Sequence, residues 1–120
     1  MPEVLALRVM IYRALKKWEL MQAVARKLAL CDPDEAQWTI AWAFATRRAD
    51  SLDAARLILV NAVERLPAVA VFHFNLACYE CQLGDLESAK ARLQQAIELQ
   101  ADLRARALDD EDLRPLWNSL

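Results

Sequence analysis

The chain contains 120 residues, 57% of them apolar, with one glycine and four prolines, and its 15 basic and 17 acidic side chains give a net charge of −2. This length suits one domain with a hydrophobic core of its own, and the composition excludes an intrinsically disordered chain. The nearly balanced charge provides no basic field that would attract a phosphate backbone, so we expect no nucleic-acid partner.

No apolar run approaches the roughly 18 residues that a membrane span needs, and the N-terminus lacks the basic region and apolar stretch of a secretory signal. We therefore expect a cytoplasmic protein with no membrane partner. Three cysteines, an odd number without a secretory signal, argue against a disulfide framework.

Apolar residues recur at intervals of three and four along most of the chain, which predicts amphipathic helices and no strands. Residues that favour turns and caps separate the helical runs. The pattern predicts helices over 3–15, 18–30, 34–48, 52–66, 69–82, 86–99, 103–107 and 111–118. The expected N-caps are Asp32, with Pro33 at the first helical position, then Asp50 or Ser51, then Asp85, and the expected helix stops are Pro67 and Gly84.

Residues of like chemistry return after 34 positions, which is the distance from Pro33 to Pro67. Small residues suit places where helices cross closely, and larger ones fill the holes between them. The matching columns are Met21, Ala55, Ala89; Ala25, Leu59, Leu93; Leu28, Ala62, Ala96; Trp18, Leu52, Leu86; and Glu19, Asp53, Glu87. A helical hairpin of 34 residues, repeated three times, explains these columns.

The period and the columns resemble the tetratricopeptide repeat family. The resemblance covers residues 2 to about 103, and its signature positions hold Leu76, Ala77, Gly84, Ala89, Leu93 and Ala96 in the third unit, Ala43, Ala55, Leu59, Ala62 and Pro67 in the second, and Tyr12 and Pro33 in the first. It implies a single all-α domain over 1–120, a right-handed α-α superhelix. Its three hairpins would occupy about 2–35, 36–69 and 70–103, followed by a capping segment at 104–120 that covers the last repeat.

Gly84 is the only glycine, and its place in the third hairpin predicts a left-handed residue at the turn between two helices. Lys16 and Asp50 stand at the equivalent places of the first and second hairpins. We expect those two turns to differ slightly from the turn at Gly84.

Three features suggest site chemistry, and each has a simpler explanation. Cys78 and Cys81 form a C-x-x-C late in a predicted helix, whereas a redox pair needs a helix N-terminus and a zinc site needs two further ligands. His73 is the only histidine, and a part-buried helix position accounts for it. Four acids at 109–112 fit helix capping better than metal binding. We therefore expect no catalytic residue, no metal and no cofactor.

The family resemblance implies that the first helix of each hairpin lines the inner face of the superhelix, where a partner would bind. This strip has apolar side chains at its centre and arginines and amides at its edge, with Phe44 and Phe74 as the expected anchors. Its residues are Met10, Arg13, Gln37, Ile40, Phe44, Arg47, Arg48, Val71, Phe74, Asn75, Cys78 and Gln82, with Ala6 beside them.

We expect a protein-interaction module, not an enzyme, that captures a peptide or helix of a partner protein on this strip. Arg47 and Arg48 would favour acidic segments, and Asn75 could bond to the ligand backbone. Two alternatives remain open. The strip could be occupied within the protein itself, by the C-terminal segment or by a second copy in a homo-oligomer, or the cysteines could serve a redox or metal function.

Overall fold

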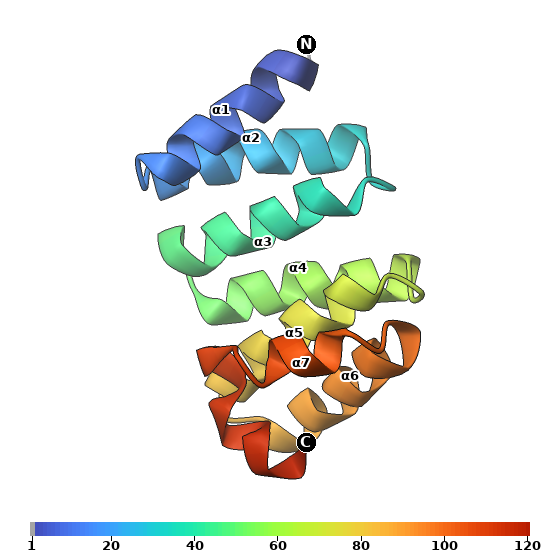
Figure 1. Ribbon diagram of the computed structural model, residues 1–120. Helices are drawn as coiled ribbons and strands as arrows, with labels where there is room; N and C mark the ends of the chain where they lie inside the picture. The colour runs from blue at the N-terminus through green and yellow to red at the C-terminus, as the bar shows by residue number, and fades with distance from the viewer. Residues whose placement is uncertain (1) are drawn as a thin grey trace. The chain divides into compact units, whose positions relative to one another are not determined.

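The computed structural model describes residues 2–120, and those residues form helices joined by short turns, with no strand among them (Figure 1). The predicted all-α class is confirmed. The helices are α1 (Pro2–Ala14), α2 (Trp18–Cys31), α3 (Ala36–Ala49), α4 (Leu52–Arg65), α5 (Ala70–Gln82), α6 (Leu86–Leu99), α7 (Leu103–Ala107) and the 3-10 helix η1 (Glu111–Ser119). None of the helices described is both long enough and apolar enough to cross a membrane.

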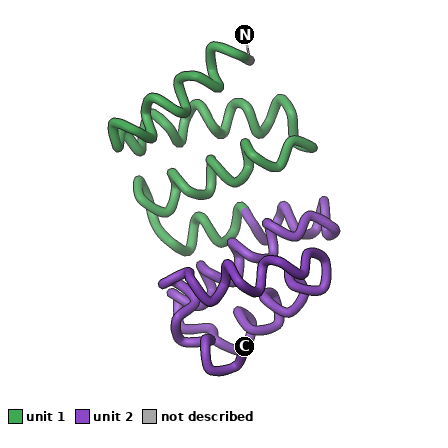
Figure 2. Tube along the Cα trace, viewed as in Figure 1, with its two compact units in different colours: residues 1–58 green, residues 59–120 purple. Residues whose placement is uncertain are grey.

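The chain divides into two compact units, one up to Ile58 and one from Leu59 to Leu120, and the boundary falls inside α4 (Figure 2). We call them unit 1 and unit 2. In unit 1, α1 packs against α2, and α2 packs against α3. In unit 2, α5 packs against α6, and η1 packs chiefly against α5. That the whole chain acts as a single domain stays a prediction.

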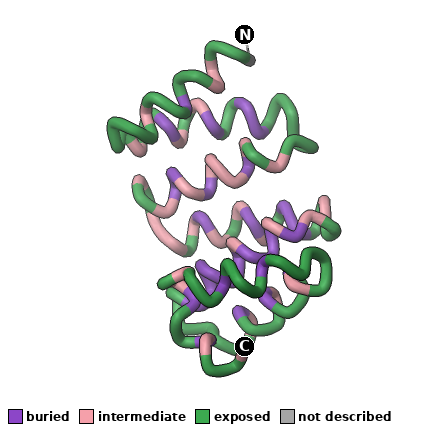
Figure 3. Tube along the Cα trace, in the orientation of Figure 1, coloured by how far each residue is buried: buried purple, intermediate pink, exposed green. Residues whose placement is uncertain are grey.

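Burial follows the 34-residue period (Figure 3). Three of the five columns, those of Met21, Ala25 and Leu28, are buried in every repeat, with at most 4% of any residue's surface exposed. Each column places one residue in α2, one in α4 and one in α6, and each of these helices has an acid in its first turn, where it faces the positive end of the helix dipole. The second helices of the hairpins therefore share one pattern of buried positions.

In unit 1 the core lies between the three N-terminal helices. Val9 of α1 meets Met21 and Ala25 of α2, and Ala45 of α3 closes the cluster. Aromatic rings of α2 and α3 are partly buried around it. The small side chains let the helices approach closely, and the rings fill the space at the edge.

In unit 2 helix α5 is buried around most of its circumference. Phe72, Phe74 and Leu76 are fully buried although they point in different directions on the helix. Helix α6 covers one side, and the C-terminal segment covers another. The sequence predicted this segment as a cap on the last repeat, and the structure shows it lying mainly on α5. Pro115, which has no N–H for an α-helical bond, lies inside the 3-10 turn of η1.

One predicted cap is wrong and two are confirmed. Asp32 ends α2 instead of starting α3, which begins at Ala36. The Asp32 carbonyl accepts from Glu35 N–H at 3.1 Å, a turn in which Asp at the first position and Pro33 at the second are both favoured. Ser51 Oγ accepts from the Ala54 N–H at 3.0 Å, and Asp85 Oδ1 accepts from the Ser88 N–H at 3.2 Å.

The turns after α1 and α5 share one geometry. Gly84 has φ +89°, and Lys16 has φ +56°. In each turn the N–H of the left-handed residue donates to the carbonyl three residues back, and the next N–H donates to the carbonyl five residues back. Gly84 N–H donates to Cys81 O, and Asp85 N–H donates to Glu80 O. Lys16 and Lys17 make the same pair of hydrogen bonds in the turn after α1. The expectation that the turn at Lys16 differs from the turn at Gly84 is therefore wrong. The turn at Asp50, which has φ −128°, does differ from it.

We predict that Gly84→Ala lowers the free energy of unfolding by about 1 kcal/mol. A Cβ at Gly84 would meet no atom within 4 Å, so the cost comes from the backbone conformation alone. Lys16→Gly, the matched change in the other direction, should raise stability by up to about 1 kcal/mol. Urea denaturation followed by circular dichroism measures the free energy of unfolding of both variants. A Gly84→Ala variant as stable as the parent would contradict the expected cost of a Cβ in this left-handed conformation.

Candidate functional site

One face of α5 is occupied by the chain's own C-terminal segment. Phe74, Cys78 and Gln82 lie one turn apart on this face. The Arg106 guanidinium carbon lies 5.0 Å from the centre of the Phe74 ring. The Cys78 Sγ lies 3.8 Å from an Asp110 carboxylate oxygen, and the Gln82 side-chain amide donates to the Asp112 backbone carbonyl at 2.9 Å. Residues 106–112 therefore run along the α5 face.

This cover changes the expected binding strip within unit 2. Phe74 and Cys78 were expected on an exposed surface, but only 0% and 4% of their surfaces are exposed, because residues 106–112 shield them. Val71 and Asn75 are partly exposed, and Gln82 is exposed. Contact between any of these residues and a partner stays a prediction.

The matching face of α3 carries a cluster of arginines and aromatic rings. The Arg48 guanidinium carbon lies 3.7 Å from the centre of the Phe44 ring and 5.2 Å from the centre of the Trp18 ring, and Arg13 lies 4.3 Å over the same Phe44 ring. The two rings pack edge to face at 5.7 Å. Arg48 also donates to the Phe44 carbonyl at 3.0 Å. Two cations thus share one ring, and each is attracted by its negative face.

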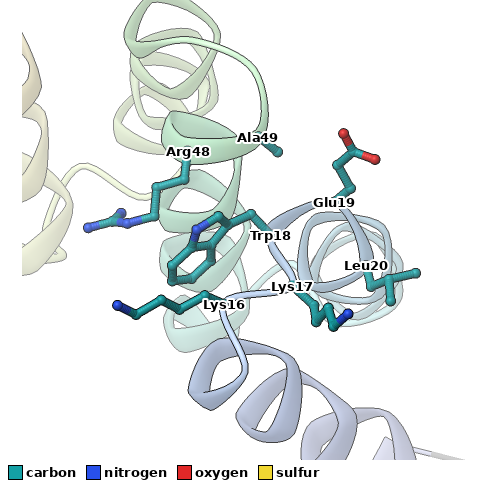
Figure 4. A pocket seen from close by; sticks show the side chains of 7 residues that line it. All are labelled: Lys16, Lys17, Trp18, Glu19, Leu20, Arg48 and Ala49. Atoms are coloured by element: carbon teal, nitrogen blue, oxygen red, sulfur yellow. The ribbon is translucent and has the colours of Figure 1, made fainter.

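An open pocket of about 440 Å³ adjoins this cluster, lined by Lys16, Lys17, Trp18, Glu19, Leu20, Arg48 and Ala49. Figure 4 shows the Trp18 indole between the Arg48 side chain from α3 and the Lys16 side chain from the turn after α1, with Glu19 pointing away. Three of the lining residues are basic and one is acidic. We call the residues Lys16, Lys17, Trp18 and Arg48 the basic pocket. Its charge favours an anionic ligand.

The remaining strip residues of unit 1 are accessible to different degrees. Met10, with 68% of its surface exposed, Arg13 and Gln37 are exposed, and Ile40 and Arg47 are partly exposed. The structure brings Arg13, Phe44 and Arg48 together, as one strip would require. The sequence did not identify Lys16 and Trp18 as site residues, since their position depends on the left-handed turn at Lys16, and a non-glycine residue in that conformation is not visible in a sequence.

The candidate catalytic side chains lie away from solvent. Cys78, Cys81 and His73 are buried, and His73 Nε2 lies 2.7 Å from the Pro67 carbonyl, to which it donates. Burial raises the pKa of the Cys81 thiol, and the charge of Asp112 raises it further. A nucleophilic cysteine needs the opposite shift, toward a lower pKa.

No protein-family model matches this chain, and no curated protein matches it at a significant level.

We predict that Cys31 alone reacts quickly with a thiol reagent such as dithionitrobenzoate. Cys31 is exposed, whereas Cys78 and Cys81 react only when unit 2 opens, because their sulfur atoms are buried. Stopped-flow absorbance should show one fast thiol and two slow thiols per chain. In the Cys31→Ser variant the fast phase should vanish. Three fast thiols, or a fast phase that survives in that variant, would restore a reactive cysteine as the alternative.

Proposed function

We propose that the chain is a protein-interaction module of the tetratricopeptide type, which binds an acidic segment of a partner protein along the α3 face that carries Ile40, Phe44 and Arg48. Its hairpins would stack as a right-handed superhelix. Support comes from the 34-residue period of buried residues and from helices of 13 or 14 residues in each hairpin.

The observation that carries this proposal is that the C-terminal segment covers one face of α5. Phe74, Cys78 and Gln82 lie 34 positions after Ile40, Phe44 and Arg48, so the two sets occupy equivalent places on the first helices of successive repeats. On α5 this face holds an acidic stretch of non-α-helical chain.

On α3 the equivalent face presents Arg48 in place of Gln82, beside Lys16 and Trp18. A carboxylate there would gain charge-assisted hydrogen bonds, which a neutral amide cannot supply to the same extent. An apolar ligand side chain would pack on the partly exposed rings of Trp18 and Phe44. Exposed charge pairs contribute only modestly, so we expect an affinity near micromolar, about −8 kcal/mol.

Selection from a random peptide library displayed on phage tests this function. We predict that the enriched peptides carry Asp or Glu next to an apolar residue. The Lys16→Gln/Arg48→Gln double variant should bind them up to about 30-fold more weakly by fluorescence anisotropy, since each lost ion pair with an exposed partner contributes up to about 1 kcal/mol. Binding to the parent should weaken as salt is raised.

The matched control is Lys27→Gln, which removes an exposed base of α2 outside the basic pocket and should leave affinity unchanged. Peptides without acidic residues, or equal binding by the double variant, would refute the acidic-segment proposal. A Phe74→Ala variant is unsuitable as a test, because this fully buried ring belongs to the core of unit 2.

Self-association is a second candidate, favoured by one observation. Asp109 and Glu111 are exposed acids, and the basic pocket of a second copy would complement their charge. Sedimentation velocity across the micromolar range separates the two functions. A concentration-dependent species that disappears in Asp109→Asn/Glu111→Gln supports self-association, and a monomer at every concentration excludes it.

A further inference from the structure

Two short motifs that are far apart in the sequence meet in unit 2. Cys78 lies on α5, and Asp110 and Asp112 lie 32 or more positions later, at the start of η1. The Cys78 sulfur and one carboxylate oxygen of each acid all lie within 4.8 Å of one another. Neither the C-x-x-C motif nor the acid run at 109–112 has enough ligands for a metal ion by itself, but the fold brings three donor atoms together.

The spacing of these donors is close to that of a tetrahedral site. With Zn–S near 2.3 Å and Zn–O near 2.0 Å, a tetrahedral ion holds a sulfur and an oxygen about 3.5 Å apart. Cys78 Sγ and Asp110 Oδ2 are 3.8 Å apart. Side-chain movements of a few tenths of an ångström would therefore bring both atoms to bonding distance.

The two acids are held in position by other hydrogen bonds. Asp110 Oδ1 accepts from the Asp112 N–H at 3.0 Å, which leaves Oδ2 directed toward Cys78. Gln82 fixes the backbone at Asp112 through the 2.9 Å bond to its carbonyl. Such outer contacts orient ligands and reduce the entropy that an ion must overcome on binding.

Cys78, Asp110 and Asp112 are the residues whose donor atoms lie together, and Cys81, three positions after Cys78, is not among them. One thiolate and two carboxylates supply three of the four positions around a tetrahedral ion, and a water molecule would fill the fourth. Cys78 is buried, with 4% of its surface exposed, and the two acids are partly buried.

We propose that Cys78, Asp110 and Asp112 bind one zinc ion, or another divalent ion that accepts thiolate, and that the ion fastens the C-terminal segment to α5. The thiolate disfavours magnesium and calcium, which prefer oxygen ligands. On binding, the ion replaces the thiol proton of Cys78, and this proton passes to solvent. No change of oxidation state is involved. The ion also offsets the repulsion between two neighbouring carboxylates.

Cobalt(II) added to the reduced, metal-free full chain tests this site, because cobalt reports its ligands by absorbance. We predict one Co²⁺ per chain, sulfur-to-cobalt charge-transfer absorption, the intense visible bands of tetrahedral geometry, and displacement by Zn²⁺. Cys78→Ser should weaken binding by at least about tenfold and reduce the charge-transfer band.

Two control variants should bind Co²⁺ like the parent: Cys31→Ser, which alters an exposed thiol in unit 1, and Asp109→Asn, which alters an exposed acid of the same run. Asp110→Asn retains the capping oxygen but loses the carboxylate charge, so it should bind weakly while circular dichroism stays unchanged. If Cys78→Ser fails to fold, Asp112→Asn decides the question in its place.

Three results would overturn the proposal. The first is the absence of stoichiometric binding to the parent. The second is binding without sulfur-to-cobalt absorption, which would show that exposed carboxylates hold the ion. The third is unchanged affinity in a folded Asp110→Asn/Asp112→Asn variant, which would exclude the acids as ligands.

Discussion

The fold depends on close helix packing that recurs every 34 residues. Where two helices cross, an alanine allows the backbones to approach, and a larger residue one turn away fills the remaining space. In α6, Ala89 and Ala96 flank Leu93, and all three are almost completely buried. The same sizes recur in α4, and α2 buries the equivalent positions with Met21, Ala25 and Leu28, so each hairpin buries its second helix at the same positions. A larger side chain at any of the alanines would force the helices apart.

The first helices of the hairpins follow one pattern of positions but have different surroundings. The place of Phe44 on α3 is taken by Cys78 on α5, and the place of Arg48 is taken by Gln82. On α5 the smaller and neutral side chains accept the chain's own segment at short distances. On α3 the ring and the guanidinium group are only partly covered. The two faces thus differ both in these two side chains and in the C-terminal segment that lies on α5.

The helices and the buried columns could be predicted because both arise from local periodicity and residue size. The caps Ser51 and Asp85 were also predictable, since each precedes its helix with a side-chain oxygen that reaches a free N–H. Asp32 was not, because Asp followed by Pro suits a turn as well as a helix start. The left-handed Lys16 escaped prediction for a related reason: the repeat placed it at the position of Gly84, but lysine rarely adopts the conformation that glycine adopts there, so a different turn was expected.

The cover on α5 lies beyond local reasoning, because its contacts join residues 30 and 32 positions apart. The acid run at 109–112 shows why composition alone misleads here. Asp110 has an extended backbone, with φ −98° and ψ 114°, so neighbouring side chains point in opposite directions. Asp110 and Asp112 are accordingly half-buried against α5, while Asp109 and Glu111 are exposed. A run that looks like uniformly solvated charge is thus two pairs of acids, and only the inward pair, Asp110 and Asp112, lies beside the Cys78 sulfur.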